Sequence, residues 1–122
     1  MHGHRDMEIV TYVMEGALRH KDSTGREEVV APNMVQAMSA GTGVIHSEYN
    51  ASATEPVHLL QIWIEPSAED LEPGYQQFAY DPAEKRGRLR LIAGPEATPG
   101  HAAVIRQDAR VYACVVGGGE TV

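Results

Sequence analysis

Hydrophobic and polar residues alternate along most of this chain, and the alternation predicts strands rather than helices. Apolar residues do not form a long stripe at the 3.6-residue spacing of an amphipathic helix. The chain is divided instead into short stretches rich in Val, Ile, Thr and Tyr, separated by Gly, Pro and Asp at intervals of about ten residues. This rhythm predicts an all-β fold in which helix is scarce.

The expected strands are rich in β-forming residues and end at turn-forming residues. The clearest is 7–14 (MEIVTYVM), and the most apolar is 57–64 (VHLLQIWI). Residues 18–21 and 27–31 flank the turn sequence DSTG, whose Gly25 can adopt positive φ, so we expect a hairpin there. Further strands are expected at 35–38, 44–49, 88–93, 104–106 and 111–116, with an acidic connection over 66–74.

Composition limits the class of protein. The 122 residues, 43% of them hydrophobic, suffice for one compact domain, which we place at 1–116 with a flexible Gly-rich tail at 117–122. Ten basic residues against seventeen acidic ones give a net charge of -7, which argues against direct nucleic-acid binding. The single cysteine, Cys114, allows no internal disulfide, and no apolar run reaches the ~18 residues of a membrane span. We therefore expect a cytoplasmic protein with no membrane partner.

Two short pairs carry the candidate chemistry, His2-Gly3-His4 and His46-Ser47-Glu48. Side chains two positions apart on a strand point to the same face, so each pair can direct both of its groups to one interior. Three imidazoles and a carboxylate suit one divalent transition metal such as Fe, Mn, Ni, Cu or Zn. A single such pair is more often a surface feature, however, and spacing alone supports the two interpretations about equally.

A family resemblance shifts that balance. The segments HGHRDMEIVTYVMEGALRHKDSTG, SAGTGVIHSE and VHLLQIWIEP closely resemble the pirin family of the cupin superfamily. The similarity continues through EPGYQQ, EKRGRLRLIA and RQDARVYA, and so covers nearly the whole chain.

The resemblance implies a double-stranded β-helix, or jelly roll, with a metal inside its barrel. The matching ligands here would be His2, His4, His46 and Glu48. Fe(II) is the first expectation for the metal, with Zn, Ni, Mn, Co or Cu as alternatives. Glu8 falls where other cupins often have a ligand, but we expect it to orient a ligand imidazole or Arg5 instead.

The chain also departs from the family pattern. Pirins carry further residues before the first histidine pair and a second cupin domain after this one. We therefore expect that a second copy of the chain completes the barrel in a homo-oligomer; a fragment and an internal start of a longer gene are the other interpretations. Pro32-Asn33-Met34 stands where the family usually has Pro-Gly-Asp, and Asn33 can keep the turn because asparagine tolerates positive φ.

Several other residues have weaker signals. We expect His20 and His101 to be surface histidines, His58 to line the pocket or pack, and Trp63 to lie in the core or an interface. Tyr12 and Gln61 are candidate pocket-wall residues. The methionines expected to fill the core are Met14, Met34 and Met38.

Two functions are consistent with these ligands. The first is a metal-dependent dioxygenase resembling the quercetin 2,3-dioxygenases among pirins, which would open a small aromatic, flavonol-like substrate with O₂; Glu48 would be its catalytic proton acceptor. The second is a non-enzymatic metal-binding or redox-sensing regulator that binds a protein partner. A shortened chain that kept the fold and lost a competent site is a third interpretation.

Overall fold

The fold consists of strands in three sheets, and every pair of named strands is antiparallel except the parallel pair of β9 (Arg90–Gly94) and β10 (Ala103–Val104). The computed structural model describes the chain apart from residues 1, 24, 98–100, 120 and 122, and describes only the backbone of His2 and His4. The strands are β1 (His2–His4), β2 (Glu8–Glu15), β3 (Leu18–Asp22), β4 (Glu27–Val30), β5 (Met34–Ser39), β6 (Val44–Asn50), β7 (His58–Ile64), β8 (Gly74–Ala79), β9 (Arg90–Gly94), β10 (Ala103–Val104) and β11 (Val111–Ala113).

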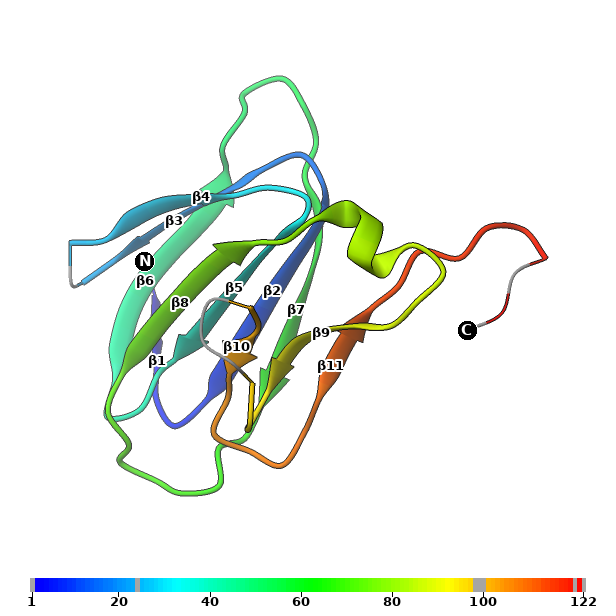
Figure 1. Ribbon diagram of the computed structural model, residues 1–122. Helices are drawn as coiled ribbons and strands as arrows, with labels where there is room; N and C mark the ends of the chain where they lie inside the picture. The colour runs from blue at the N-terminus through cyan, green and yellow to red at the C-terminus, as the bar shows by residue number, and fades with distance from the viewer. Residues whose placement is uncertain (1, 24, 98–100, 120, 122) are drawn as a thin grey trace.

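The sheets form three layers (Figure 1). One outer sheet, named here the front sheet, has the strand order β1-β6-β3-β4 and lies at the left of Figure 1. The middle sheet has the order β7-β2-β5-β8. The small outer sheet on the other side, named here the back sheet, has the order β10-β9-β11 and lies at the right of the figure. All pairs within the front and middle sheets are antiparallel. The two larger sheets face each other, and the back sheet covers the opposite face of the middle one.

The two faces of β2 explain this layering. Its side chains alternate, so Ile9 and Val13 face the front sheet, whereas Val10 faces the back sheet. Ile9 packs with Val44 of β6, and Val13 packs with Leu18 of β3 and with β4. β2 is therefore nearly fully buried for most of its length, which accounts for its continuous apolar run.

The all-β prediction is confirmed. The hairpin of β3 and β4 forms as expected, with φ +89° at Gly25, and Asn33 adopts φ +65°. The only helix among the described residues is the short 3₁₀ helix η1 (Pro82–Lys85), which Asp81 caps. No helix in the described part of the chain is long and apolar enough to cross a bilayer.

Three details of the sequence prediction were wrong. The strand β8 was not predicted, because its sequence GYQQFA alternates only weakly. Met14 is 39% exposed and is not a core residue; Trp63 is 49% exposed, which leaves the interface as the remaining prediction for that residue. Tyr12 does not line the site described below, because it faces the back of the middle sheet, where its hydroxyl accepts a hydrogen bond from Lys85.

The loop before β6 requires glycine at Gly41. This residue has φ +52°, and a Cβ there would overlap the carbonyl oxygen of Leu71 and lie 2.8 Å from the nitrogen of Pro73. Gly25 has a similar backbone conformation, but no described atom lies within 4 Å of its Cβ position. Gly25→Ala should therefore cost only the left-handed backbone penalty, about 1–2 kcal/mol.

We predict that Gly41→Ala lowers the free energy of unfolding by more than Gly25→Ala, because a backbone clash adds to the same backbone penalty. Urea denaturation of both variants and the wild type measures the difference. Equal losses in the two variants would show that the Leu71–Pro73 segment moves aside at no cost.

Candidate metal centre

The strand β6 presents an acidic and a basic side chain to the interior. Its residues alternate, so Val44, His46 and Glu48 point inward, whereas Ile45 and Tyr49 are about half exposed. His46 is 1% exposed. The i, i+2 spacing therefore brings His46 and Glu48 to one face, as the sequence predicted.

The neighbouring strand β3 adds a second pair that the sequence analysis did not select. The antiparallel register places His20 opposite Glu48 and Asp22 opposite His46. Residues directly opposite in such a pair lie on the same face of the sheet. His20 is completely buried and Asp22 is 8% exposed. The prediction that His20 lies on the surface was wrong, because β3 extends to Asp22 and turns His20 inward.

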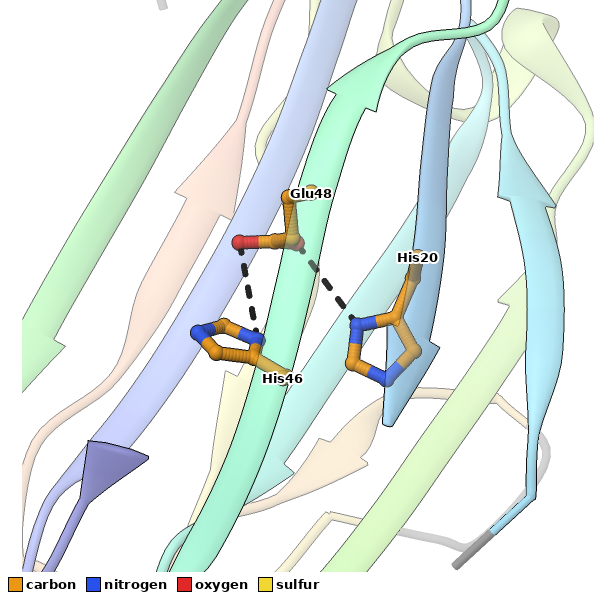
Figure 2. A group of neighbouring side chains, drawn as sticks. All are labelled: His20, His46 and Glu48. Carbon is orange, nitrogen blue, oxygen red and sulfur yellow. Dashed lines mark ion pairs between the residues drawn. The ribbon is translucent and has the colours of Figure 1, made fainter. Parts of the chain in front are cut away.

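Glu48 lies between the two imidazoles (Figure 2). Its Oε2 is 3.8 Å from Nδ1 of His20, and its Oε1 is 3.8 Å from Nδ1 of His46. One ligand atom from each of the three residues can be chosen so that all lie within 4.8 Å of one another. The three side chains thus converge on a single small volume.

The middle sheet supplies a polar wall opposite this group. Thr11 of β2 lies between Gln61 of β7 and Gln36 of β5 in the sheet register. The side-chain amide of Gln61 donates hydrogen bonds to Oε1 of Glu48 (2.5 Å) and to Oγ1 of Thr11 (3.4 Å). The prediction that Gln61 lies in the pocket wall agrees with these contacts.

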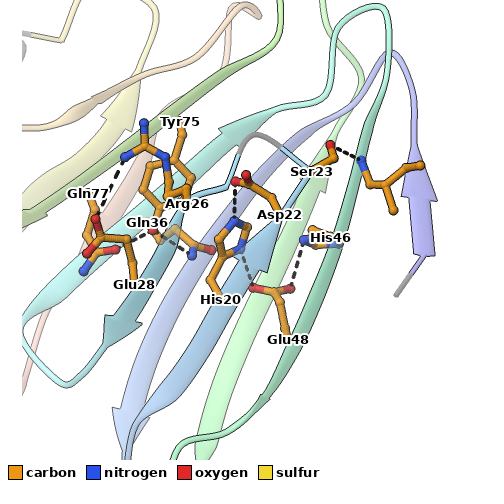
Figure 3. A network of polar contacts seen from close by, with 11 residues as sticks. His20, Asp22, Ser23, Arg26, Glu28, Gln36, His46, Glu48, Tyr75 and Gln77 are labelled. Atoms are coloured by element: carbon orange, nitrogen blue, oxygen red, sulfur yellow. Dashed lines mark hydrogen bonds and ion pairs between the residues drawn. The ribbon is translucent and has the colours of Figure 1, made fainter.

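Tyr75 of β8 separates the cluster from an adjoining cavity. Its ring lies 5.0 Å from the His20 ring, centroid to centroid, and its hydroxyl donates to Gln77 and accepts from Gln36 (Figure 3). The guanidinium of Arg26 lies 4.3 Å from the centre of the Tyr75 ring. Both residues line a cavity of about 600 Å³, within the size range of small-molecule sites.

Opposite charges in the cluster stabilise each other. Burial lowers the pKa of His20, but Glu48 and Asp22 raise it by more, so the net shift is upward. Burial raises the pKa of Glu48, but His20, the Gln61 amide and His46 lower it by more, so the net shift is downward. Glu48 is therefore a carboxylate at neutral pH. Burial raises the pKa of Tyr75 to about 12, which keeps its hydroxyl protonated.

His46 and Glu48 fit a bound divalent metal ion. Two ligands on one ion can be at most about 4.2 Å apart, twice a bond of about 2.1 Å, and the 3.8 Å between Nδ1 of His46 and Oε1 of Glu48 falls within that limit. Within the described part of the chain, Oε2 of Glu48 makes no hydrogen bond although it is buried. A buried polar atom without a partner costs about 1–3 kcal/mol, and a cation at this position would remove that cost.

The four predicted ligands are only partly described. His46 and Glu48 lie together, as stated above. The backbone of His2 and His4 forms β1, with His2 opposite His46 and His4 opposite Val44, but their side chains lie outside the described residues. The complete four-ligand set therefore stays a prediction.

Glu8, His58 and His101 were given other roles by the sequence analysis, and all three lie away from the described side chains of the site. Glu8 is buried on the opposite face of β2, where it accepts a hydrogen bond from the backbone of Arg106. Among the described side chains it contacts neither His46 nor Arg5, which pairs with Asp70, whereas the imidazoles of His2 and His4 lie outside the described residues. His58 and His101 are both exposed, which confirms the surface assignment of His101.

A sequence signal for the missed pair did exist. His20-Lys21-Asp22 has the same i, i+2 spacing as His46-Ser47-Glu48. The spacing shows that each pair lies on one face of its strand, but only the β3–β6 register shows that the two faces are the same one.

The charges of His20 and Glu48 should make the stability of the metal-free protein depend on pH. The His20 pKa is raised above its ordinary 6.5, so its contribution is complete below pH 6.5 and is lost as the pH rises through the folded-state pKa. The Glu48 pKa is lowered below 4.5, so its contribution is complete above pH 4.5 and is lost as the pH falls through the folded-state pKa. Both contributions to stability are therefore complete between pH 4.5 and pH 6.5.

We predict that the metal-free wild type loses more stability than metal-free His20→Asn between about pH 5.5 and about pH 8.5. Urea denaturation of both proteins at both pH values gives the two differences. Asp22, Glu28, His46, Glu48 and Tyr75 face or adjoin His20 and are present in both proteins, so the difference between the two losses reports the removal of His20. Equal losses of stability in the two proteins would contradict the conclusion that folding raises the pKa of His20.

Comparison with known proteins identifies similar sequences and structures. A protein of Mycobacterium tuberculosis, provisionally named a quercetin 2,3-dioxygenase, is 54% identical over 92 residues, which are 75% of this chain and 38% of that protein. Quercetin 2,3-dioxygenase of Escherichia coli K12 is 46% identical over 111 residues, 91% of this chain and 46% of that protein. The chain thus spans less than half the length of these relatives.

A solved structure with a similar fold contains a metal ion. The bacterial pirin YhhW of Escherichia coli in complex with nickel(II) superposes with a TM-score of 0.80 at 43% identity, covering 91% of this chain and 46% of that one. The family model described as Pirin matches residues 1–64, more than half of this chain of 122 residues. The chain belongs to the pirin family.

Proposed function

We propose that the chain binds one divalent transition metal through His46 and Glu48 of β6 together with His2 and His4 of β1. The observation that carries this proposal is the buried His46–Glu48 pair, in which one carboxylate oxygen has no hydrogen bond among the described residues. The backbone register supports the contribution of β1, because it places His2 directly opposite His46.

The donor set narrows the choice of metal but does not fix it. Imidazole and carboxylate ligands suit Fe, Mn, Co, Ni, Cu and Zn alike, and the similar Escherichia coli structure was solved with nickel(II). We take Fe(II) as the metal of the reaction proposed below, because O₂ is one of its two substrates.

The reaction we propose is the oxidative ring opening of a small flavonol-like compound by O₂, in line with the names of the relatives. When bound, the metal supplies Lewis acidity and a path for electrons between the organic substrate and O₂. Glu48 is the proposed acceptor of the substrate hydroxyl proton. Its lowered pKa keeps it ionised at neutral pH, as a proton acceptor must be.

Other residues of the chain would orient the substrate and keep water out. The polar row of Thr11, Gln36 and Gln61 offers fixed hydrogen-bonding groups on one side of the cluster. Apolar clusters close the space between the sheets on either side of that row.

We predict that the purified chain binds one Ni(II) per chain and that His46→Ala and Glu48→Gln each weaken binding by at least about 10-fold, because each removes a ligand. Isothermal titration calorimetry measures both quantities. The exposed residues His101 and Glu69 supply the matched controls, His101→Ala and Glu69→Gln, which should bind like the wild type. Unchanged affinity in both site variants would refute the metal centre.

We further predict that the Fe(II)-loaded chain consumes quercetin under air and that Glu48→Gln lowers the rate by about 10²–10⁴-fold, the usual contribution of a general base. Loss of flavonol absorbance reports turnover. A wild type that binds the metal in full but shows no turnover with any of Fe, Mn, Co, Ni or Cu would instead favour the non-enzymatic regulator.

A further inference from the structure

The buried pair His20 and Asp22 has no role in the function proposed so far. Nε2 of His20 lies 2.8 Å from Oδ2 of Asp22, and the side chains are 0% and 4% exposed, respectively. A carboxylate cannot donate a hydrogen bond, so Asp22 fixes a proton on Nε2 and orients the ring. The other ring nitrogen, Nδ1, then faces Glu48 (Figure 3).

Glu48 has a polar neighbour on each side. Gln61 donates a hydrogen bond to Oε1 from the middle sheet, while Nδ1 of His20 lies 3.8 Å from Oε2 within the front sheet, an ion-pair separation longer than a hydrogen bond. The two supports come from different layers, so together they restrict rotation of the carboxylate. Strand pairing fixes the position of His20, because it lies directly opposite Glu48 in the β3–β6 register.

We propose that His20, oriented by Asp22, is a positioning residue that holds the Glu48 carboxylate in place for metal binding. This inference rests on the proposed function, since it takes Glu48 to be a ligand. Groups that orient a ligand in this way typically contribute 10–100-fold to metal affinity. His20 acts through Glu48 and does not itself bind the metal.

Substitutions at His20 separate this role from simple packing. His20→Leu removes both ring nitrogens, whereas His20→Asn keeps an amide N–H close to the place of Nδ1, from which it can still reach Glu48. Asp22→Asn keeps the size of the side chain but removes the charge that orients the ring. His101→Leu deletes an exposed histidine and is the matched control.

The experiment is Ni(II) titration of the purified full chain by calorimetry, with X-ray absorption of the bound nickel to count imidazole ligands. We expect His20→Leu to bind about 10–100-fold more weakly than the wild type with the same number of imidazoles. His20→Asn should bind more tightly than His20→Leu, Asp22→Asn should be weakened, and His101→Leu should be unchanged. Melting of the metal-free variants identifies any that do not fold, and the remaining ones carry the test.

Two results would overturn the inference. Affinity of folded His20→Leu or Asp22→Asn within about twofold of the wild type would mean that the pair does not position Glu48. Loss of one imidazole from the nickel in His20→Asn or His20→Leu would mean that His20 is itself a ligand. Failure of the proposed function has a different signature, because the wild type would then not bind one Ni(II) per chain, or Glu48→Gln would bind as well as the wild type.

Discussion

The pairing of β3 with β6 is the constraint on which the rest of the site depends. It sets His20 against Glu48 and Asp22 against His46, so that four ionisable side chains share one face of the front sheet. Taking charged groups out of water is costly unless they are paired. Here each carboxylate lies within 3.8 Å of an imidazole nitrogen, and opposite charges offset that cost.

The interior between the two large sheets is arranged as a polar layer between two apolar ones. Along β2, Ile9 belongs to one apolar cluster, Thr11 to the polar row, and Val13 to the other cluster. The apolar layers exclude water and strengthen electrostatic interactions in the polar layer. Three residues on one face of β2, Ile9, Thr11 and Val13, thus contribute to both the core and the candidate centre.

The opposite face of β2 connects the centre to the back sheet. Val10 lies in the large cluster formed with β9 and β10, and Glu8 accepts a hydrogen bond from the backbone of Arg106. The described side chains of the centre come from residues 11–75, whereas β9, β10 and β11 support the middle sheet from behind. The region matched in the longer Escherichia coli relatives covers 91% of the chain.

The sequence by itself determined the all-β class, most strands, the hairpin around Gly25, and the pair His46–Glu48, because strand periodicity and turn chemistry are local properties. It misjudged His20, Met14 and Tyr12, because burial and facing depend on which strands become neighbours. Only the tertiary structure decided that His20-x-Asp22 and His46-x-Glu48 face each other, and that Gln61 reaches Glu48 from another sheet. Register between strands distant in sequence is fixed by the packing of whole sheets, which no single segment encodes.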